Sequence, residues 1–258
     1  MATRIHYRRF VLFLLIVAGV ILSGGTPLSA GTIFRDDFSG SISSAWSIVR
    51  PNTSYYSFQP TYLDLRANRG DIWLSRNDAY NLFLIDTPTN DDFVATMRLN
   101  SFVPTSASNA PQIDILAYDN DNAHVRCGYG TFGATGGQRA MELAVEQGGY
   151  QANRLLQDFG SGPFYLRLEK TGNTYTQYYS TNGTSFQKSL GPVAFGDGTP
   201  AKLGFVAMSD PYQSSRAYID YFEVTVADVP EPSSLVLLFA AMGCLLAIGR
   251  RWRRSEPA

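Results

Sequence analysis

Two glutamates four residues apart, Glu142 and Glu146, have a spacing that could support hydrolytic chemistry. Successive side chains of a β-strand point to opposite faces, so residues four apart share a face. Retaining hydrolysis of a glycosidic bond uses two carboxyl groups about 5–5.5 Å apart, and two positions on one strand face can approach that separation. The pair is a candidate hydrolytic site, although no aspartate lies between the two glutamates.

Other catalytic groups are scarce between residues 31 and 229. His124 is the only histidine and Cys127 the only cysteine of this stretch. One histidine and one cysteine do not supply the usual zinc ligands, and neither a nucleophile elbow nor a phosphate-binding loop is present. We therefore expect the protein not to be an enzyme. We also expect it to hold no cofactor, with one structural calcium ion as the candidate exception.

Polar and apolar side chains alternate on several expected strands. If these strands are sheet neighbours, their polar sides form one face of planar hydrogen-bonding groups beside a tyrosine, which could meet a sugar. The alternative is a solvated face with cross-strand ion pairs, each contributing about 0.2–1 kcal/mol. The residues of this candidate glycan-binding face are Gln112, Asp114, Arg126, Glu142, Tyr165 and Arg167.

Three aspartates, Asp36, Asp37 and Asp220, form a candidate calcium site. Asp36 and Asp220 alternate with aromatic residues, which places a carboxylate on an apolar face, and that is costly unless the carboxylate is paired or binds a cation. The first and last strands of jelly rolls often lie together, so these aspartates could surround a Ca²⁺ ion, which prefers oxygen ligands. Hydrogen bonding to turn amides or to an arginine is the alternative.

Short runs with period-2 alternation recur along the chain and are separated by Gly, Asn, Asp, Pro and Ser, which is typical of strands and turns. Asn182-Gly183 is a strong hairpin-turn signal, and Asp119-Asn120-Asp121-Asn122 is expected to be a turn rather than a calcium loop. We predict an all-β fold, a two-sheet sandwich of jelly-roll type. The expected strands are 62–65, 82–85, 93–99, 113–118, 124–132, 141–145, 164–169, 174–179, 203–208 and 218–226.

The N-terminus has the features of a secretory signal peptide. Arg4, Arg8 and Arg9 precede an apolar run at 10–22, and small residues follow up to Ala30. This order predicts a signal peptide at 1–30 that is cleaved after Ala30. An uncleaved anchor is the alternative, but the apolar run is short against the roughly 20 residues that a membrane span needs.

The C-terminus has three parts, namely Pro230-Glu231-Pro232, an apolar stretch at 235–249, and four arginines between 250 and 254. In order, spacing and residue types it resembles the PEP-CTERM sorting signal. That resemblance implies export in a Gram-negative bacterium that makes extracellular polysaccharide, with an exosortase recognising and removing residues 230–258. The apolar stretch would form a helix of about 22 Å, which is marginal against a hydrocarbon core of about 30 Å. A permanent C-terminal membrane anchor is the alternative.

The charge of the chain is unevenly distributed. The formal net charge is −1 overall, but residues 31–229 carry 20 acidic and 14 basic residues, a net of −6. An acidic domain without a basic stripe does not favour nucleic-acid binding, which requires Lys and Arg against phosphates.

Residues 31–229 are also similar, in an ordered set of stretches, to the concanavalin A-like domain that is appended to β-xylosidases. The stretches are 34–40 with Trp46, 62–65, 164–169, 178–183 and 219–224. The resemblance implies a two-sheet sandwich of the lectin/glucanase superfamily. Glycanases of that superfamily carry Glu-x-Asp-x-Glu on one strand. In this chain Gln112 stands two residues before Asp114 and Leu116 two residues after it, where the glycanases have glutamates.

Together these features predict an exported, non-catalytic glycan-binding module at the cell surface, in the outer membrane or in the extracellular matrix. Its expected partners are an exosortase, a polysaccharide, and the membrane through the C-terminal helix before processing. A structural matrix or adhesion protein without a small ligand is the alternative, and a divergent glycoside hydrolase using Glu142 and Glu146 is a third.

Overall fold

A computed structural model describes residues 31–89, 92–104, 111–132, 138–158, 165–196, 199–209 and 215–226. The chain divides into two units, residues 1–227 and 228–258, and all described residues belong to the first. Three of the predicted features lie outside the described residues. They are the cleavage position Ala30, the motif Pro230-Glu231-Pro232 and the apolar helix expected at 235–249. Within the described ranges, no helix has the length and apolar character needed to cross a membrane.

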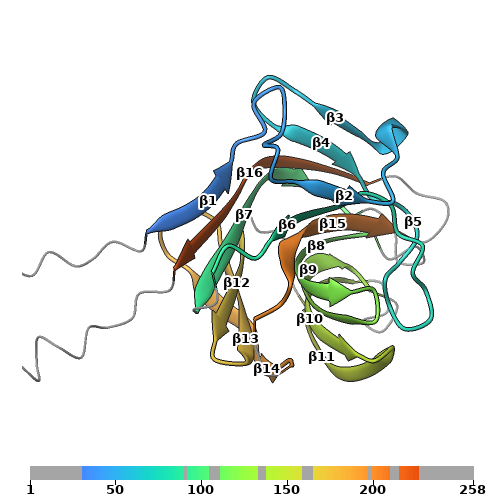
Figure 1. Ribbon diagram of the computed structural model, residues 1–258, viewed down its shortest axis with the longest axis vertical. Helices are drawn as coiled ribbons and strands as arrows, with labels where there is room; N and C mark the ends of the chain where they lie inside the picture. Colours follow the sequence, from blue (N-terminus) through green and yellow to red (C-terminus); the bar gives the residue numbers. More distant parts are fainter. Residues whose placement is uncertain are drawn as a thin grey trace, which may run out of the picture. The chain divides into compact units, whose positions relative to one another are not determined.

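Two eight-stranded sheets form the described part of the first unit (Figure 1). Sheet A has the strand order β14-β13-β12-β7-β16-β4-β3, and β1 pairs with β16. Its strands are β1 (Thr32–Asp36), β3 (Tyr56–Phe58), β4 (Leu63–Arg66), β7 (Phe93–Phe102), β12 (Tyr165–Thr171), β13 (Thr174–Ser180), β14 (Gln187–Ala194) and β16 (Arg216–Val226).

Sheet B has the order β11-β10-β9-β8-β15-β6-β2, and the short β5 pairs with β15 in parallel. Its strands are β2 (Ser47–Val49), β5 (Asn68–Arg69), β6 (Leu82–Asp86), β8 (Gln112–Asn120), β9 (Ala123–Thr131), β10 (Arg139–Gln147), β11 (Tyr150–Asp158) and β15 (Lys202–Ser209). A single 3₁₀ turn, η1 (Thr53–Tyr55), precedes β3 and is the only helical element among the described residues.

The strand positions confirm the all-β prediction. Each of the ten alternating runs overlaps a strand of the structure, and the first and last strands pair side by side, with Asp36 opposite Phe222. Six strands were not among these runs, namely β1, β2, β3, β5, β11 and β14. Each of them pairs with one neighbouring strand only, so one side of its ladder is unpaired and its side-chain pattern is less constrained.

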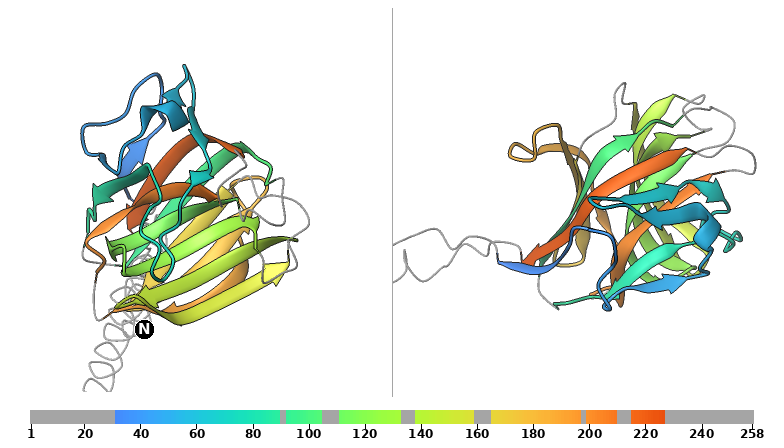
Figure 2. Two further views of the ribbon diagram at one scale, coloured as in Figure 1. Left: turned by 90° about the vertical axis from the view of Figure 1, so that its right-hand side faces the viewer. Right: turned by 90° about the horizontal axis from the view of Figure 1, so that it is seen from above.

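The main hydrophobic core lies between the sheets, which form two layers (Figure 2). Trp46 is at its aromatic centre, with its ring centroid 5.3 Å from that of Phe205 and 5.5 Å from that of Phe222. Phe83 stacks on Phe205 at 5.2 Å. These aromatic contacts join residues of sheet B to β16 of sheet A.

Candidate functional site

The six predicted ligand-binding residues divide between the two sheets. β8, β9 and β10 are consecutive neighbours of sheet B, whereas β12 pairs with β7 and β13 in sheet A. The expectation of one shared face therefore holds for Gln112, Asp114, Arg126 and Glu142, and is wrong for the two residues of β12, Tyr165 and Arg167. Alternation assigns a side chain to one side of its own strand, but it does not assign the strand to a sheet.

A buried charge cluster occupies the outer face of sheet B. Arg126 is 2% exposed and Glu142 is 0% exposed, and their side chains form an ion pair at 2.9 Å. Arg126 also pairs with Asp71 at 2.9 Å, and Arg154 pairs with Glu142 at 2.7 Å. We define the buried charge cluster as Asp71, Asp114, Arg126, Glu142, Glu146 and Arg154.

Residues 70–81, which we call the cover segment, lie over this face, and the left view of Figure 2 shows the segment crossing the strands of sheet B. The Trp73 ring lies 4.5 Å from the guanidinium carbon of Arg126. The backbone N–H of Leu74 donates a hydrogen bond of 2.7 Å to Glu146. A second apolar cluster fixes the segment to the sheet, since Ile72 and Ala79 pack with residues of β6, β8 and β15.

Asp114 is the most unusual member of the buried charge cluster. Its side chain is fully buried, and neither carboxyl oxygen has a hydrogen-bond partner among the described residues. Burial raises the pKa of Asp114 well above its ordinary value, although the charge of Arg126 opposes the shift. The carboxyl packs directly on Gly128, because a Cβ at that glycine would lie 1.7 Å from Asp114 Oδ1.

The cover segment leaves the predicted hydrolytic pair without access to a polymer. Glu142 and Glu146 are both buried, and burial raises the pKa of Glu146. Gln112 and Asp114 are on the same face and also buried. A polysaccharide could contact these groups only if the cover segment moved away.

The outer face of sheet A carries a different arrangement, a continuous series of arginines and aromatic rings. The guanidinium carbon of Arg35 lies 3.8 Å from the Tyr221 ring centroid, and the Tyr221 and Tyr165 centroids are 6.5 Å apart. Tyr165 meets Phe186 edge-on at 6.2 Å, and Arg167 lies 3.3 Å from the Phe186 centroid. We call these five residues the arginine–aromatic row, and each of them keeps part of its surface exposed.

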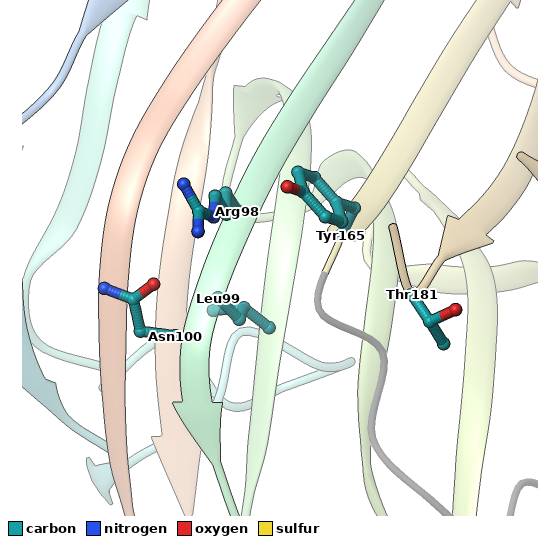
Figure 3. A pocket seen from close by; sticks show the side chains of 5 residues that line it. All are labelled: Arg98, Leu99, Asn100, Tyr165 and Thr181. Carbon is teal, nitrogen blue, oxygen red and sulfur yellow. The ribbon is translucent and has the colours of Figure 1, made fainter. Parts of the chain in front are cut away.

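A hollow of about 220 Å³ opens beside this row (Figure 3). Its wall is formed by Arg98, Leu99, Asn100, Tyr165 and Thr181. In Figure 3 the Tyr165 hydroxyl points toward Arg98, whose guanidinium carbon lies 5.8 Å from the Tyr165 ring centroid. Pockets that enclose whole ligands are about 300–1,000 Å³, so this hollow suits one projecting group of a larger ligand.

The turn after β13 positions the aromatic side of the hollow. The Asn182 side chain accepts hydrogen bonds from the N–H groups of Thr184 and Ser185, at 3.0 and 2.9 Å. Gly183 adopts φ +75°, and a Cβ there would lie 2.6 Å from the Tyr165 ring. The predicted Asn182-Gly183 turn is thus confirmed, and the lack of a side chain at Gly183 lets the Tyr165 ring approach the backbone closely.

The predicted calcium ligands are held by protein groups. Asp36 accepts hydrogen bonds from the N–H groups of Phe38 and Ser43 and from the indole of Trp46. Asp37 pairs with Arg35 at 2.6 Å. No group of three or more His, Cys, Asp or Glu side chains suited to a metal occurs in the described ranges. Calcium binding stays a prediction.

Asp220 does not lie on the apolar face, which corrects the alternation-based prediction. The register of β16 against β7 shifts between Ile219 and Tyr221, so Asp220 is an extra residue in a β-bulge, and a bulge reorients side chains. Its carboxylate pairs with Arg98 at 2.6 Å.

Several residues of the two faces were missed by the sequence analysis, namely Trp73, Arg98, Asn100, Phe186 and Tyr221. Trp73 carried a signal, since a tryptophan in a stretch with no alternation indicates a segment that packs on something. Tyr221 became part of the outer face through the bulge, and Phe186 through the turn, and neither effect is visible in period-2 alternation.

The fold and the two faces define a concanavalin A-like β-sandwich. The GH43 protein BlXynB from Bacillus licheniformis has a similar structure, with a TM-score of 0.62 and 19% identity over 75% of this chain and 39% of that chain. The xylan β-1,4-xylosidase from Bacillus halodurans has a TM-score of 0.61 and 17% identity over 78% of this chain and 40% of that chain. The chain thus spans about two fifths of these enzymes.

A functionally unknown protein from Saccharomyces cerevisiae is similar over nearly its whole length. It has a TM-score of 0.53 and 13% identity over 71% of this chain and 97% of that chain. At these identities the likeness establishes the fold alone. No curated protein matches the sequence.

The C-terminal residues 228–254 match the model of the PEP-CTERM protein-sorting motif. The chain therefore carries the signal by which exosortases sort exported bacterial proteins, in agreement with the resemblance drawn from Pro230-Glu231-Pro232.

Proposed function

We propose that the protein, exported and sorted through its PEP-CTERM signal, is a non-catalytic glycan-binding module. It binds a polysaccharide of the cell surface, outer membrane or extracellular matrix of a Gram-negative bacterium. The observation that carries this proposal is the arginine–aromatic row on sheet A, with the hollow beside Tyr165.

The row combines the two kinds of contact that sugars need. Tyrosine and phenylalanine rings present flat apolar surfaces with an electrostatically negative face, against which the C–H groups of a pyranose can pack. Arginine and asparagine side chains beside them offer several hydrogen-bond donors for hydroxyl groups. Because the row crosses β1, β16, β12 and the turn after β13, it suits an extended chain.

The non-catalytic part of the proposal is supported by the buried charge cluster. General acid–base catalysis requires the carboxyl groups to reach the substrate, and Glu142 and Glu146 lie beneath the cover segment. Gln112 on the same face has no carboxylate and cannot act as a nucleophile.

The test is binding of the purified mature protein to a polysaccharide array. We expect binding to at least one polymer, weakened about tenfold by Tyr165→Ala, because central aromatic contacts dominate recognition. Tyr150→Ala is the matched control, since Tyr150 is 79% exposed and lies on β11 of sheet B. Binding to no polysaccharide would leave the structural matrix role as the better account.

The same preparation tests catalysis. Incubation with the bound polymer should release no reducing sugar. Release that Glu142→Gln abolishes would instead identify the protein as a glycoside hydrolase.

A further inference from the structure

The environment of Arg167 indicates which class of polysaccharide the row would select. Its guanidinium forms one hydrogen bond, from Nε to the Thr96 hydroxyl at 3.3 Å. No ion pair joins Arg167 to any carboxylate of the described residues, and its two terminal amino groups have no hydrogen-bond acceptor there. The side chain is nevertheless partly buried, and burial lowers the pKa of Arg167.

The other arginine of the row, Arg35, and the neighbouring Arg98 are already neutralised. Arg35 pairs with Asp37 and Glu223, both at 2.6 Å. Arg98 pairs with Asp220 at 2.6 Å. Glu169, two residues from Arg167 on the same strand, raises the pKa of Arg167 through its charge but forms no ion pair with it. Arg167 is therefore the arginine of the row that retains an unused charge.

The guanidinium of Arg167 is also held in one orientation. Phe186 covers one of its faces at 3.3 Å, and the bond to Thr96 fixes its Nε edge. The remaining edge carries the terminal N–H groups, in the fork geometry that matches two oxygens of a carboxylate. A partly desolvated cation without a partner is costly, and a bound anion would offset that cost.

We propose that Arg167 is a carboxylate anchor and that the glycan is an acidic polysaccharide of the uronic-acid class. This inference rests on the proposed glycan-binding function and adds the class of sugar. One uronate carboxylate would bind the free edge of Arg167 in a bidentate manner, while neighbouring sugar rings pack on Phe186 and Tyr165. Because residues 31–229 have a net charge of −6, the attraction must be this local contact rather than a long-range field.

The test compares polygalacturonate with the same polymer after complete methyl esterification, using the full mature protein. We expect binding to the free acid to be about tenfold tighter than to the ester, as bidentate charged hydrogen bonds predict. Equal binding to both polymers would overturn the anchor. This comparison needs no variant, so it stands even if a substitution at Arg167 disturbs folding.

Variants then assign the effect to Arg167. Arg167→Gln should lose the preference for the free acid, and Arg167→Lys should keep only part of it, because lysine cannot form the fork. The matched control is Arg69→Gln, which removes the same charge from an exposed position on β5 of sheet B and should leave the preference unchanged. An unchanged preference in Arg167→Gln would overturn the assignment.

The outcomes also separate this inference from the proposed function. Binding to neutral polysaccharides that Tyr165→Ala weakens, without preference for the free acid, would refute the anchor and keep the glycan-binding function. Binding to no polysaccharide would refute both. Stronger binding to a sulfated dextran than to polygalacturonate would refute the uronic-acid assignment.

Discussion

The outer faces of the two sheets both carry arginines, carboxylates and aromatic rings, yet they differ in accessibility. On sheet B the cover segment lies over Arg126 and Glu142, which are almost completely buried. On sheet A the row from Arg35 to Arg167 has no such cover among the described residues, and Arg98 remains 43% exposed. Similar residue types are therefore buried on one face and partly exposed to solvent on the other.

The difference has a direct energetic consequence. Ion pairs near solvent contribute about 0–1 kcal/mol, whereas removing one partner of a buried pair leaves an uncompensated charge and costs about 3–5 kcal/mol. Substitutions on sheet B should thus change stability, and substitutions on the row of sheet A should change binding.

The largest loss of stability is expected for Arg126→Gln. It leaves Asp71 and the buried Glu142 without their shared cation, although Glu142 keeps its pair with Arg154. The free energy of unfolding should therefore fall by about 3 kcal/mol, the lower end of the range for a buried pair. Arg98→Gln, which breaks an exposed pair with Asp220, is the control and should cost about 1 kcal/mol or less. Urea denaturation measures the free energy of unfolding of both variants. Equal losses would show that ion pairs on the two faces contribute equally to stability.

A smaller but clear loss is expected for Gly128→Ala. The added Cβ would lie 1.7 Å from Asp114 Oδ1, and overpacking of this kind costs about 1–3 kcal/mol. The double variant Gly128→Ala with Asp114→Ala should recover most of the loss, because the clashing carboxyl is gone. Thermal unfolding is the measurement, and a failure of the second substitution to rescue the first would contradict the close packing of these two residues.

The smallest change in stability is expected for Asp114→Asn, and the size of this change should depend on pH. The folded state raises the pKa of Asp114 by burial, so folding favours the protonated acid. The contribution of Asp114 to the stability of the wild-type protein should therefore fall as the pH rises above about 4, the ordinary pKa of aspartate. The amide cannot ionise, so the variant should lack this loss, and its advantage in melting temperature should grow from pH 4.5 to pH 7.5.

The corresponding control is Asp220→Asn on the exposed face. Its carboxylate is paired with Arg98, so this substitution should not produce an advantage that grows with pH. A pH-independent difference between wild type and Asp114→Asn would show that Asp114 ionises freely in the folded protein.

Much of the fold was predictable from the amino-acid sequence. Period-2 alternation located ten strands, because a half-buried strand must turn one side to the core. The Asn182-Gly183 turn was recognisable from its residue types, because few residues adopt the required backbone angles. The pairing of β1 with β16 followed from the expected jelly-roll architecture.

The candidate site was predicted only in part. Tyr165 and Arg167 were identified, but on the wrong face, and Phe186 and Tyr221 were not identified. The bulge at Asp220 changes the side on which the following residues lie, and one inserted residue is enough to mislead alternation. The role of Trp73 depends on where residues 70–81 cross the sheet, which is a long-range property.

The sequence by itself determined that the protein carries an export and sorting signal, that the domain is an all-β sandwich, and which side chains of each strand are polar. These properties are local, since they depend on residue types and on spacings of a few positions. Only the tertiary structure decided which polar face is covered and which is open. That depends on strand order and on the path of one connecting segment, and both are settled by contacts between residues far apart in the chain.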